Sequence, residues 1–125
     1  RPDAFTLAYA SDGQQRWVTT FDGVGGADAA QDVAVDSRRG IIYATGLSDL
    51  KPGSNVPYEY LLLAYDRDGQ VVDTTIFSEM RPRRSDAAAI AVDDRSGRVV
   101  ISGTSLGEQG TGPGSLRTVA YPPAA

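Results

Sequence analysis

The chain has 125 residues, of which 41% are hydrophobic, 8% aromatic and 22% charged, proportions typical of one soluble globular domain. Twelve Lys and Arg against sixteen Asp and Glu give a net charge of −4, so we expect no nucleic-acid partner. The absence of Cys and His excludes disulfides, thiol nucleophiles and Ser-His or Cys-His catalysis, and the apolar runs are far shorter than the roughly 20 residues that insertion of a helix into a membrane needs.

Segments with the composition of short β-strands follow one another along the whole chain. Turn residues separate them: Asp-Gly pairs at 12–13 and 68–69 favour the positive φ of tight hairpins, and Gly40 and Gly97 close two further turns. The expected strands, in chain order, are residues 5–10, 16–21, 29–36, 41–46, 60–66, 71–77, 87–93, 98–103 and 115–121.

These segments repeat with a period of about 56 residues. An Ala-Tyr pair ends the first strand at Tyr9 and recurs at Tyr65 and Tyr121, and we assign these tyrosines a structural role. The turns and strands between the first two copies recur in the same order, and a third copy begins where the chain stops. Four-stranded antiparallel units with this period predict an all-β fold made of β-propeller blades.

Several stretches also resemble a known bacterial repeat. They are Trp17 on its strand, Tyr65-Asp-x-x-Gly69, Phe21-x-Gly23, Ala-Val-Asp-x-x-x-Gly at 34–40 and Ile-Tyr-Ala-Thr-Gly-x-Ser at 42–48. Together they resemble the SBBP-type β-propeller repeat, which is related to NHL repeats, over nearly all of residues 3–121. The resemblance implies blades of a secreted or cell-surface bacterial protein and implies no particular activity.

The resemblance also implies how the strands are ordered within a blade. It makes the strand at 29–36 the innermost and the Trp17 strand the outermost. The alternation of small residues with Val33 and Val35 also suits a tightly packed inner strand. One departure from the repeat is that Asp73 stands where Trp17 stands in the preceding copy, which indicates diverged blades.

Counting strands in this order divides the chain into parts of three blades. We expect two strands of a partial blade in 1–28, a complete blade in 29–77 and three strands of a partial blade in 78–125, all within one propeller-type domain. Since about three or more repeats are needed for a stable core, we expect the chain to be part of a larger ring. A fragment of a longer polypeptide is favoured over closure by identical chains, in which the strands at 3–9 and 115–121 would compete for one place.

The long connections are where we expect a ligand or partner to bind. Connections in such a meander alternate between the two ends of the strands, so all four long ones fall at the same end. Arg81, Arg83 and Arg84 form the one local basic cluster there and could bind a carboxylate, sulfate or phosphate through bidentate hydrogen bonds. A solvated, salt-bridged loop is the alternative.

Two aspartates and the tryptophan receive structural roles. Asp36 and Asp93 occupy equivalent positions and could approach each other as a carboxylate pair, but each directly precedes a turn closed by Gly. We therefore expect each to cap its own turn. Trp17 is expected to be a large apolar plug between blades.

Neither a metal site nor a catalytic site is predicted. Asp66-x-Asp68-Gly69 resembles the start of a calcium loop, but the further oxygen ligands and the closing Glu are missing. Turn chemistry accounts for these aspartates, so we expect no metal, no cofactor and no catalytic residue.

The leading functional prediction is a non-enzymatic interaction or scaffold module of a secreted or cell-surface bacterial protein, which binds a protein or glycan through its long-loop end. One alternative is part of a propeller enzyme, a glycan hydrolase or lyase, whose catalytic residues lie on blades outside this chain. The other is a structural subunit that self-assembles into a ring or filament. Further blades of the same precursor, or identical chains, are the partners that these interpretations imply.

Overall fold

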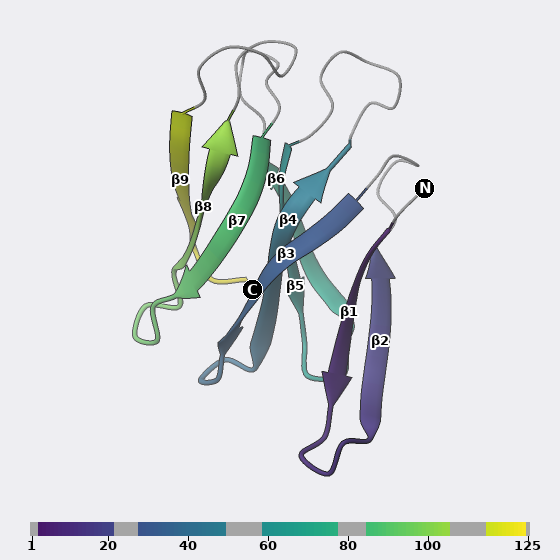
Figure 1. Ribbon diagram of the computed structural model, residues 1–125. Helices are drawn as coiled ribbons and strands as arrows, with labels where there is room; N and C mark the ends of the chain where they lie inside the picture. Colours follow the sequence, from purple (N-terminus) through teal and green to yellow (C-terminus); the bar gives the residue numbers. More distant parts are fainter. Residues whose placement is uncertain (1–2, 22–27, 50–58, 78–84, 106–114, 125) are drawn as a thin grey trace.

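The computed structural model describes residues 3–21, 28–49, 59–77, 85–105 and 115–124, and within them the chain is all-β (Figure 1). The strands are β1 (Ala4–Tyr9), β2 (Gln15–Phe21), β3 (Asp28–Asp36), β4 (Ile41–Ser48), β5 (Glu59–Tyr65), β6 (Val71–Phe77), β7 (Ser85–Val92), β8 (Val99–Ser105) and β9 (Ser115–Tyr121). Each expected strand is confirmed to within two residues at either end. The described part of the chain contains no helix that is long and apolar enough to cross a membrane.

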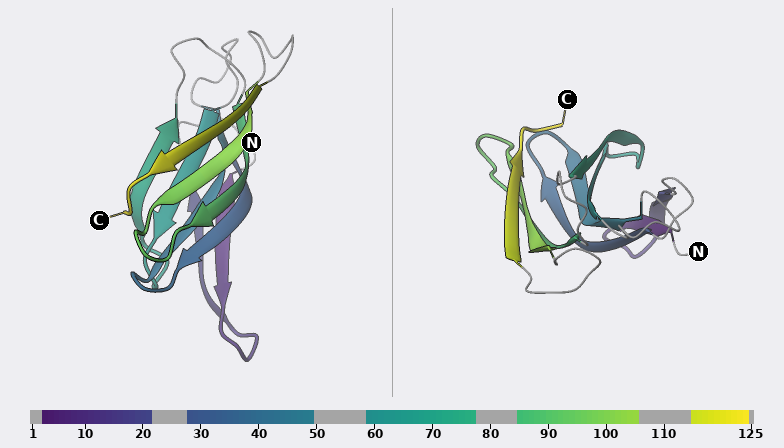
Figure 2. Two further views of the ribbon diagram at one scale, coloured as in Figure 1. Left: turned by 90° about the vertical axis from the view of Figure 1, so that its left-hand side faces the viewer. Right: turned by 90° about the horizontal axis from the view of Figure 1, so that it is seen from above.

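The strands form three antiparallel sheets in chain order. The first sheet is β1-β2, the second is β3-β4-β5-β6 and the third is β7-β8-β9, so each strand pairs with its sequence neighbour. The sheets stack face against face, which is clearest in the view from above (Figure 2). The tight turns lie together at one end of the strands, and the strand ends that border the undescribed ranges lie at the other (Figure 1).

Irregularities of the backbone recur with the sequence period. The β1-β2 ladder shifts register between Ala8 and Tyr9, and the β5-β6 ladder does so between Ala64 and Tyr65. The β3-β4 and β7-β8 ladders share a second shift, near the start of β3 and of β7. Since a bulge re-aims the side chains that follow it, equivalent residues of different sheets point to equivalent faces.

The second sheet is buried on both of its faces at β5. Trp17 and Phe21 of β2 pack on the face that carries Leu61, Leu63 and Tyr65. The opposite face packs on the third sheet, in a cluster that contains Ile41, Tyr43, Tyr60, Leu62, Ala64, Ala87, Val99 and Ile101. Every side chain of β5 from Tyr60 to Tyr65 is therefore at most 5% exposed, and each large one contributes about 2 kcal/mol to folding.

The expectation that β3 is tightly packed is wrong for two of its residues. Val33 and Val35 are 55% and 56% exposed. They point to the side of the first sheet, of which two strands are described and which reaches β3 through β1. The equivalent strand β7 packs against β3, β4 and β5, so its Ile90 and Val92 are half-buried.

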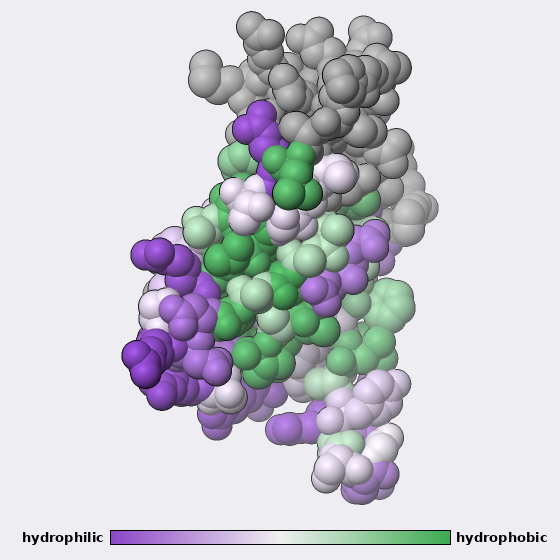
Figure 3. Space-filling model, turned by 60° about the vertical axis from the view of Figure 1, so that its left-hand side comes forward, coloured by the Kyte–Doolittle hydropathy of each residue, from purple (hydrophilic) through white to green (hydrophobic). Residues whose placement is uncertain are grey.

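The outward face of the third sheet is also uncovered. Figure 3 shows hydrophobic side chains in the middle of this face and hydrophilic residues gathered at the tight-turn end. Ala91 and Ala120 are exposed there, and Leu116 is 76% exposed. Both ends of the stack therefore present apolar surface that no described residue covers.

Trp17 fixes the first sheet on the second. Its ring lies 5.7 Å from that of Tyr65, and its indole Nε1 donates a hydrogen bond of 3.0 Å to the carbonyl oxygen of Arg67. The hydroxyl of Thr19 donates to the carbonyl oxygen of Gly69 at 2.6 Å. Gly69 has a φ of +83°, and a Cβ there would lie 2.5 Å from Cδ2 of Trp17. Both the turn and the indole therefore need glycine at this position.

Alanine substitutions at two glycines separate these requirements. Gly13 has a φ of +90° but open space around it, so Gly13→Ala should cost about 1 kcal/mol of unfolding free energy through its backbone alone. Gly69→Ala should cost about 2 kcal/mol more, because the indole must move. Urea unfolding measures both losses. Since Trp17 is the one tryptophan of the chain, its fluorescence should shift to longer wavelength in Gly69→Ala only. Equal losses and an unshifted emission would contradict this contact.

Candidate functional site

Asp36 links the second and third sheets at the tight-turn end. It is fully buried, and it accepts hydrogen bonds from the backbone N–H and from Nη1 of Arg39, both at 3.1 Å. Nη2 of Arg39 reaches the carbonyl oxygen of Arg95 in the β7-β8 turn at 3.4 Å. Gly97 leaves room for this guanidinium, since a Cβ there would lie 2.6 Å from Cζ. Asp36 thus caps its own turn and holds the arginine that crosses to the next sheet.

Asp93 caps the equivalent turn but is exposed. It accepts hydrogen bonds from the hydroxyl of Ser96 at 2.7 Å and from the backbone N–H of Arg95 at 3.2 Å. The Ser96 bond, followed by the Arg95 bond, lowers the pKa of this carboxyl below its ordinary value. Both aspartates are held by their own turns, so the arrangement favours turn capping over paired carboxylate chemistry.

The three repeated tyrosines occupy three different environments. Tyr65 is fully buried under the first sheet and its hydroxyl accepts a hydrogen bond of 3.1 Å from Thr6. Burial raises the pKa of Tyr65, and the bond from Thr6 lowers it by less. Tyr121 is half-buried against the second sheet, which also raises its pKa. Tyr9 is 60% exposed because no described sheet lies over β1. Equivalent positions in the repeat therefore do not give these tyrosines equal burial.

A groove of about 340 Å³ runs along the free edge of β1, and we call it the β1 groove. It lies between β1 and β3, and its lining residues are Phe5, Thr6, Leu7, Ala30, Gln31, Asp32, Val33 and Ala44. Among the described strands β1 pairs only with β2, so no described strand is hydrogen-bonded along its other edge. Phe5 is 58% exposed and Leu7 39% exposed along this edge.

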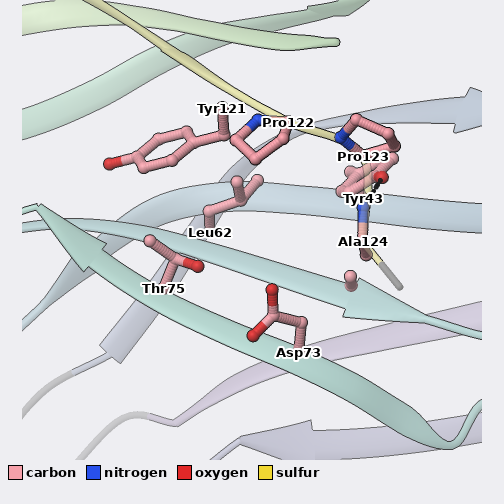
Figure 4. Close-up of a pocket in the computed structure, with 9 residues that line it drawn as sticks. Tyr43, Leu62, Asp73, Thr75, Tyr121, Pro122, Pro123 and Ala124 are labelled. Atoms are coloured by element: carbon pink, nitrogen blue, oxygen red, sulfur yellow. Dashed lines mark hydrogen bonds between the residues drawn. The ribbon is translucent and has the colours of Figure 1, made fainter. Parts of the chain in front are cut away.

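A second recess of about 140 Å³ lies between β6 and the segment that follows β9, and we call it the β6 pocket. Its lining residues are Tyr43, Leu62, Ala64, Asp73, Thr75, Tyr121, Pro122, Pro123 and Ala124. Asp73 and Thr75 extend from β6 on one side, Tyr121 and Pro122 lie on the other, and Leu62 lies between (Figure 4). The backbone N–H of Ala124 donates to the hydroxyl of Tyr43 at 3.0 Å, which holds the segment over the recess.

The predicted basic cluster cannot be placed against these recesses. Arg81, Arg83 and Arg84 lie outside the described residues. Within the described ranges no three Asp, Glu, His or Cys side chains gather in a way that could hold a metal ion.

Two polar links between strands were not identified from the sequence. Asp32 of β3 accepts a hydrogen bond of 3.0 Å from the backbone N–H of Ile90 in the third sheet. The hydroxyl of Ser48 donates to the buried carboxylate of Asp28 at 2.5 Å. The recurrence of Ser48 one period later is a sequence signal for the second link. No comparable signal marks the first, since Ala89 stands one period after Asp32.

Comparison of the chain with protein-family models and with curated proteins finds no match. The two recesses are therefore interpreted from their own residues.

The capping role of Asp93 predicts a dependence of stability on pH. Because its pKa in the folded chain lies below the ordinary value of 3.8, its stabilising effect is present above that value and is lost as the pH falls through the lower pKa. Asp93→Asn should therefore lower the urea midpoint at neutral pH and leave it nearly unchanged at about pH 2. Asp94→Asn, an exposed neighbour on the same turn, is the matched control and should have little effect at either pH. An equal loss for Asp93→Asn at both pH values would contradict the capping by the carboxylate.

Proposed function

We propose that the chain is part of a β-propeller and acts as a non-enzymatic interaction or scaffold module. The observation that carries this proposal is the stacking of three antiparallel sheets in chain order, in which β2 of the first sheet packs on β5 of the second and β7 of the third packs on β3, β4 and β5. The 56-residue period and the SBBP-type resemblance support the same interpretation. The sheets of two, four and three strands would then be parts of three consecutive blades.

The surface proposed for a protein or glycan partner is the end opposite the tight turns. All the strand ends that border the long connections lie at that end (Figure 1). The connection between β6 and β7 carries Arg81, Arg83 and Arg84, whose guanidinium groups suit carboxylate or sulfate groups of a partner. The proposed location, secreted or on a bacterial cell surface, rests on the SBBP-type resemblance.

A pair of double variants tests the binding end. Arg81→Ala with Arg83→Ala should weaken binding of an acidic glycan or protein found by array or affinity capture by about tenfold or more, because charge-assisted hydrogen bonds are lost. Arg38→Ala with Arg95→Ala removes the same charge from the tight-turn end and should leave binding unchanged. Binding that survives the first pair would remove the arginine cluster from the proposal. Turnover of a glycan by the chain would instead favour the enzyme alternative.

The exposed strand β1 favours self-assembly as a second candidate function. Its free edge and the apolar side chains of Phe5, Leu7 and Tyr9 form a surface on which a strand of a second copy can add. Val18 of β2 extends the same face and is 50% exposed.

Sedimentation velocity over a range of concentrations tests this candidate. The wild-type mass should rise above the 13.2 kDa of one chain, and Leu7→Lys should return it to that value, since a charge on an edge strand opposes pairing. Val72→Lys, which places the same charge on an exposed residue of β6, is the control and should not change the mass. A wild-type chain that remains a monomer at every concentration would reject self-assembly.

A further inference from the structure

The two contacts between neighbouring sheets use equivalent strands, and one large side chain of the first contact has no large counterpart in the second. In the first sheet Trp17 pairs with Ala8, and in the second sheet Asp73 pairs with Ala64 at the equivalent place in the ladder. Along the same face, Thr19 and Phe21 correspond in the same way to Thr75 and Phe77. Asp73 therefore occupies the position in the second sheet that Trp17 occupies in the first.

This substitution accounts for the β6 pocket. At the first contact the indole of Trp17 fills the space over Tyr65. At the second contact Tyr121 takes the place of Tyr65, but the short side chain of Asp73 leaves the space beside it empty, as a recess of about 140 Å³. A cavity of about 150 Å³ is enough to hold one benzene ring. The space thus suits a single ring in place of the indole.

The walls of the pocket combine an apolar floor with an anionic mouth. Leu62, Ala64 and the ring of Tyr121 supply apolar and aromatic surface. Asp73 is exposed at the solvent side, and within the described part of the chain neither its carboxylate nor the hydroxyl of Thr75 makes a hydrogen bond or an ion pair. Both groups face the recess (Figure 4). A carboxylate at the mouth repels anions and attracts an ammonium group, with which it forms a charge-assisted hydrogen bond.

We propose that the β6 pocket binds a small arylalkylamine, a cation that carries one aromatic ring and an ammonium group on a short linker. The ring lies against Tyr121 and Leu62 in the place of the missing indole. The ammonium group donates to the carboxylate of Asp73 and to the hydroxyl oxygen of Thr75. The net charge of −4 adds a favourable field for a cation. This proposal does not rest on the proposed binding of a protein or glycan at the opposite end of the molecule or on self-assembly.

Two matched probes test the role of charge. Benzylamine has the ring and the ammonium group, and benzyl alcohol has the same ring and linker without the charge. In titrations followed by backbone amide shifts, benzylamine should bind the wild-type chain about tenfold more tightly than benzyl alcohol, with the largest shifts at residues around the pocket. Equal binding of the two probes, or no binding of benzylamine, would overturn the proposal.

Substitutions of Asp73 place the binding at this pocket. Asp73→Asn keeps the size of the side chain and should weaken benzylamine binding to the level of benzyl alcohol. Asp12→Asn removes the same charge from the distant β1-β2 turn and should change nothing, because an amide oxygen can still accept the hydrogen bond from the backbone N–H of Gln14. Unchanged benzylamine binding in Asp73→Asn would overturn the proposal.

Refilling the pocket is the complementary test. Asp73→Trp should restore the ring that the first contact has, abolish the binding of both probes and raise the melting temperature. Benzylamine binding of wild-type strength in a folded Asp73→Trp variant would place the ligand elsewhere and overturn the proposal. If this larger substitution prevents folding, the comparison of Asp73→Asn with Asp12→Asn still decides the outcome.

Discussion

A β-sheet with two apolar faces needs a neighbour on each side, and the second sheet meets this need at every residue from Tyr60 to Tyr65 of β5. Each sheet that covers it then has an outward face of its own, which carries Phe5 and Leu7 at one end of the stack and Leu116 at the other. Each sheet therefore buries the facing side of its neighbour, and the exposed apolar surface lies on the outward faces of the first and third sheets.

The sequence predicts the strands well because their signals are local. Asp-Gly turns and alternating apolar residues act within a few neighbours, and the period adds the equivalence of distant strands. Local signals do not predict the exposure of Val33, because this exposure depends on how much of β3 the first sheet covers. Local signals also do not predict the hydrogen bond from the Arg39 side chain to the carbonyl oxygen of Arg95, because this bond depends on the distance between turns of different sheets. The replacement of Trp17 by Asp73 is visible in the sequence, but the pocket that it leaves also depends on the path of residues 122–124.

Equivalent residues of the repeat point their side chains to the same face of their sheets, but the neighbours of these side chains differ. The hydroxyl of Tyr65 is bonded to Thr6 beneath a covering sheet, Tyr121 borders a recess, and Tyr9 faces solvent. The aspartates that cap the turns behave in the same way: Asp36 is buried with a guanidinium, whereas Asp93 is exposed. A repeated residue therefore identifies a place in the sheet, and its chemistry is decided by the neighbouring sheet.

The two recesses have different walls, and this difference determines what each can bind. The β1 groove lies beside β1, which among the described strands pairs only with β2, so it offers backbone N–H and C=O groups along the open edge of β1. Such an edge suits an extended chain, whose own backbone completes the ladder. The β6 pocket lies between the second and third sheets, where the small charged side chain of Asp73 stands one period after Trp17. The side chains that line it supply a carboxylate, a hydroxyl and apolar surface, so selectivity there depends on Asp73, Thr75 and the apolar surface beside them.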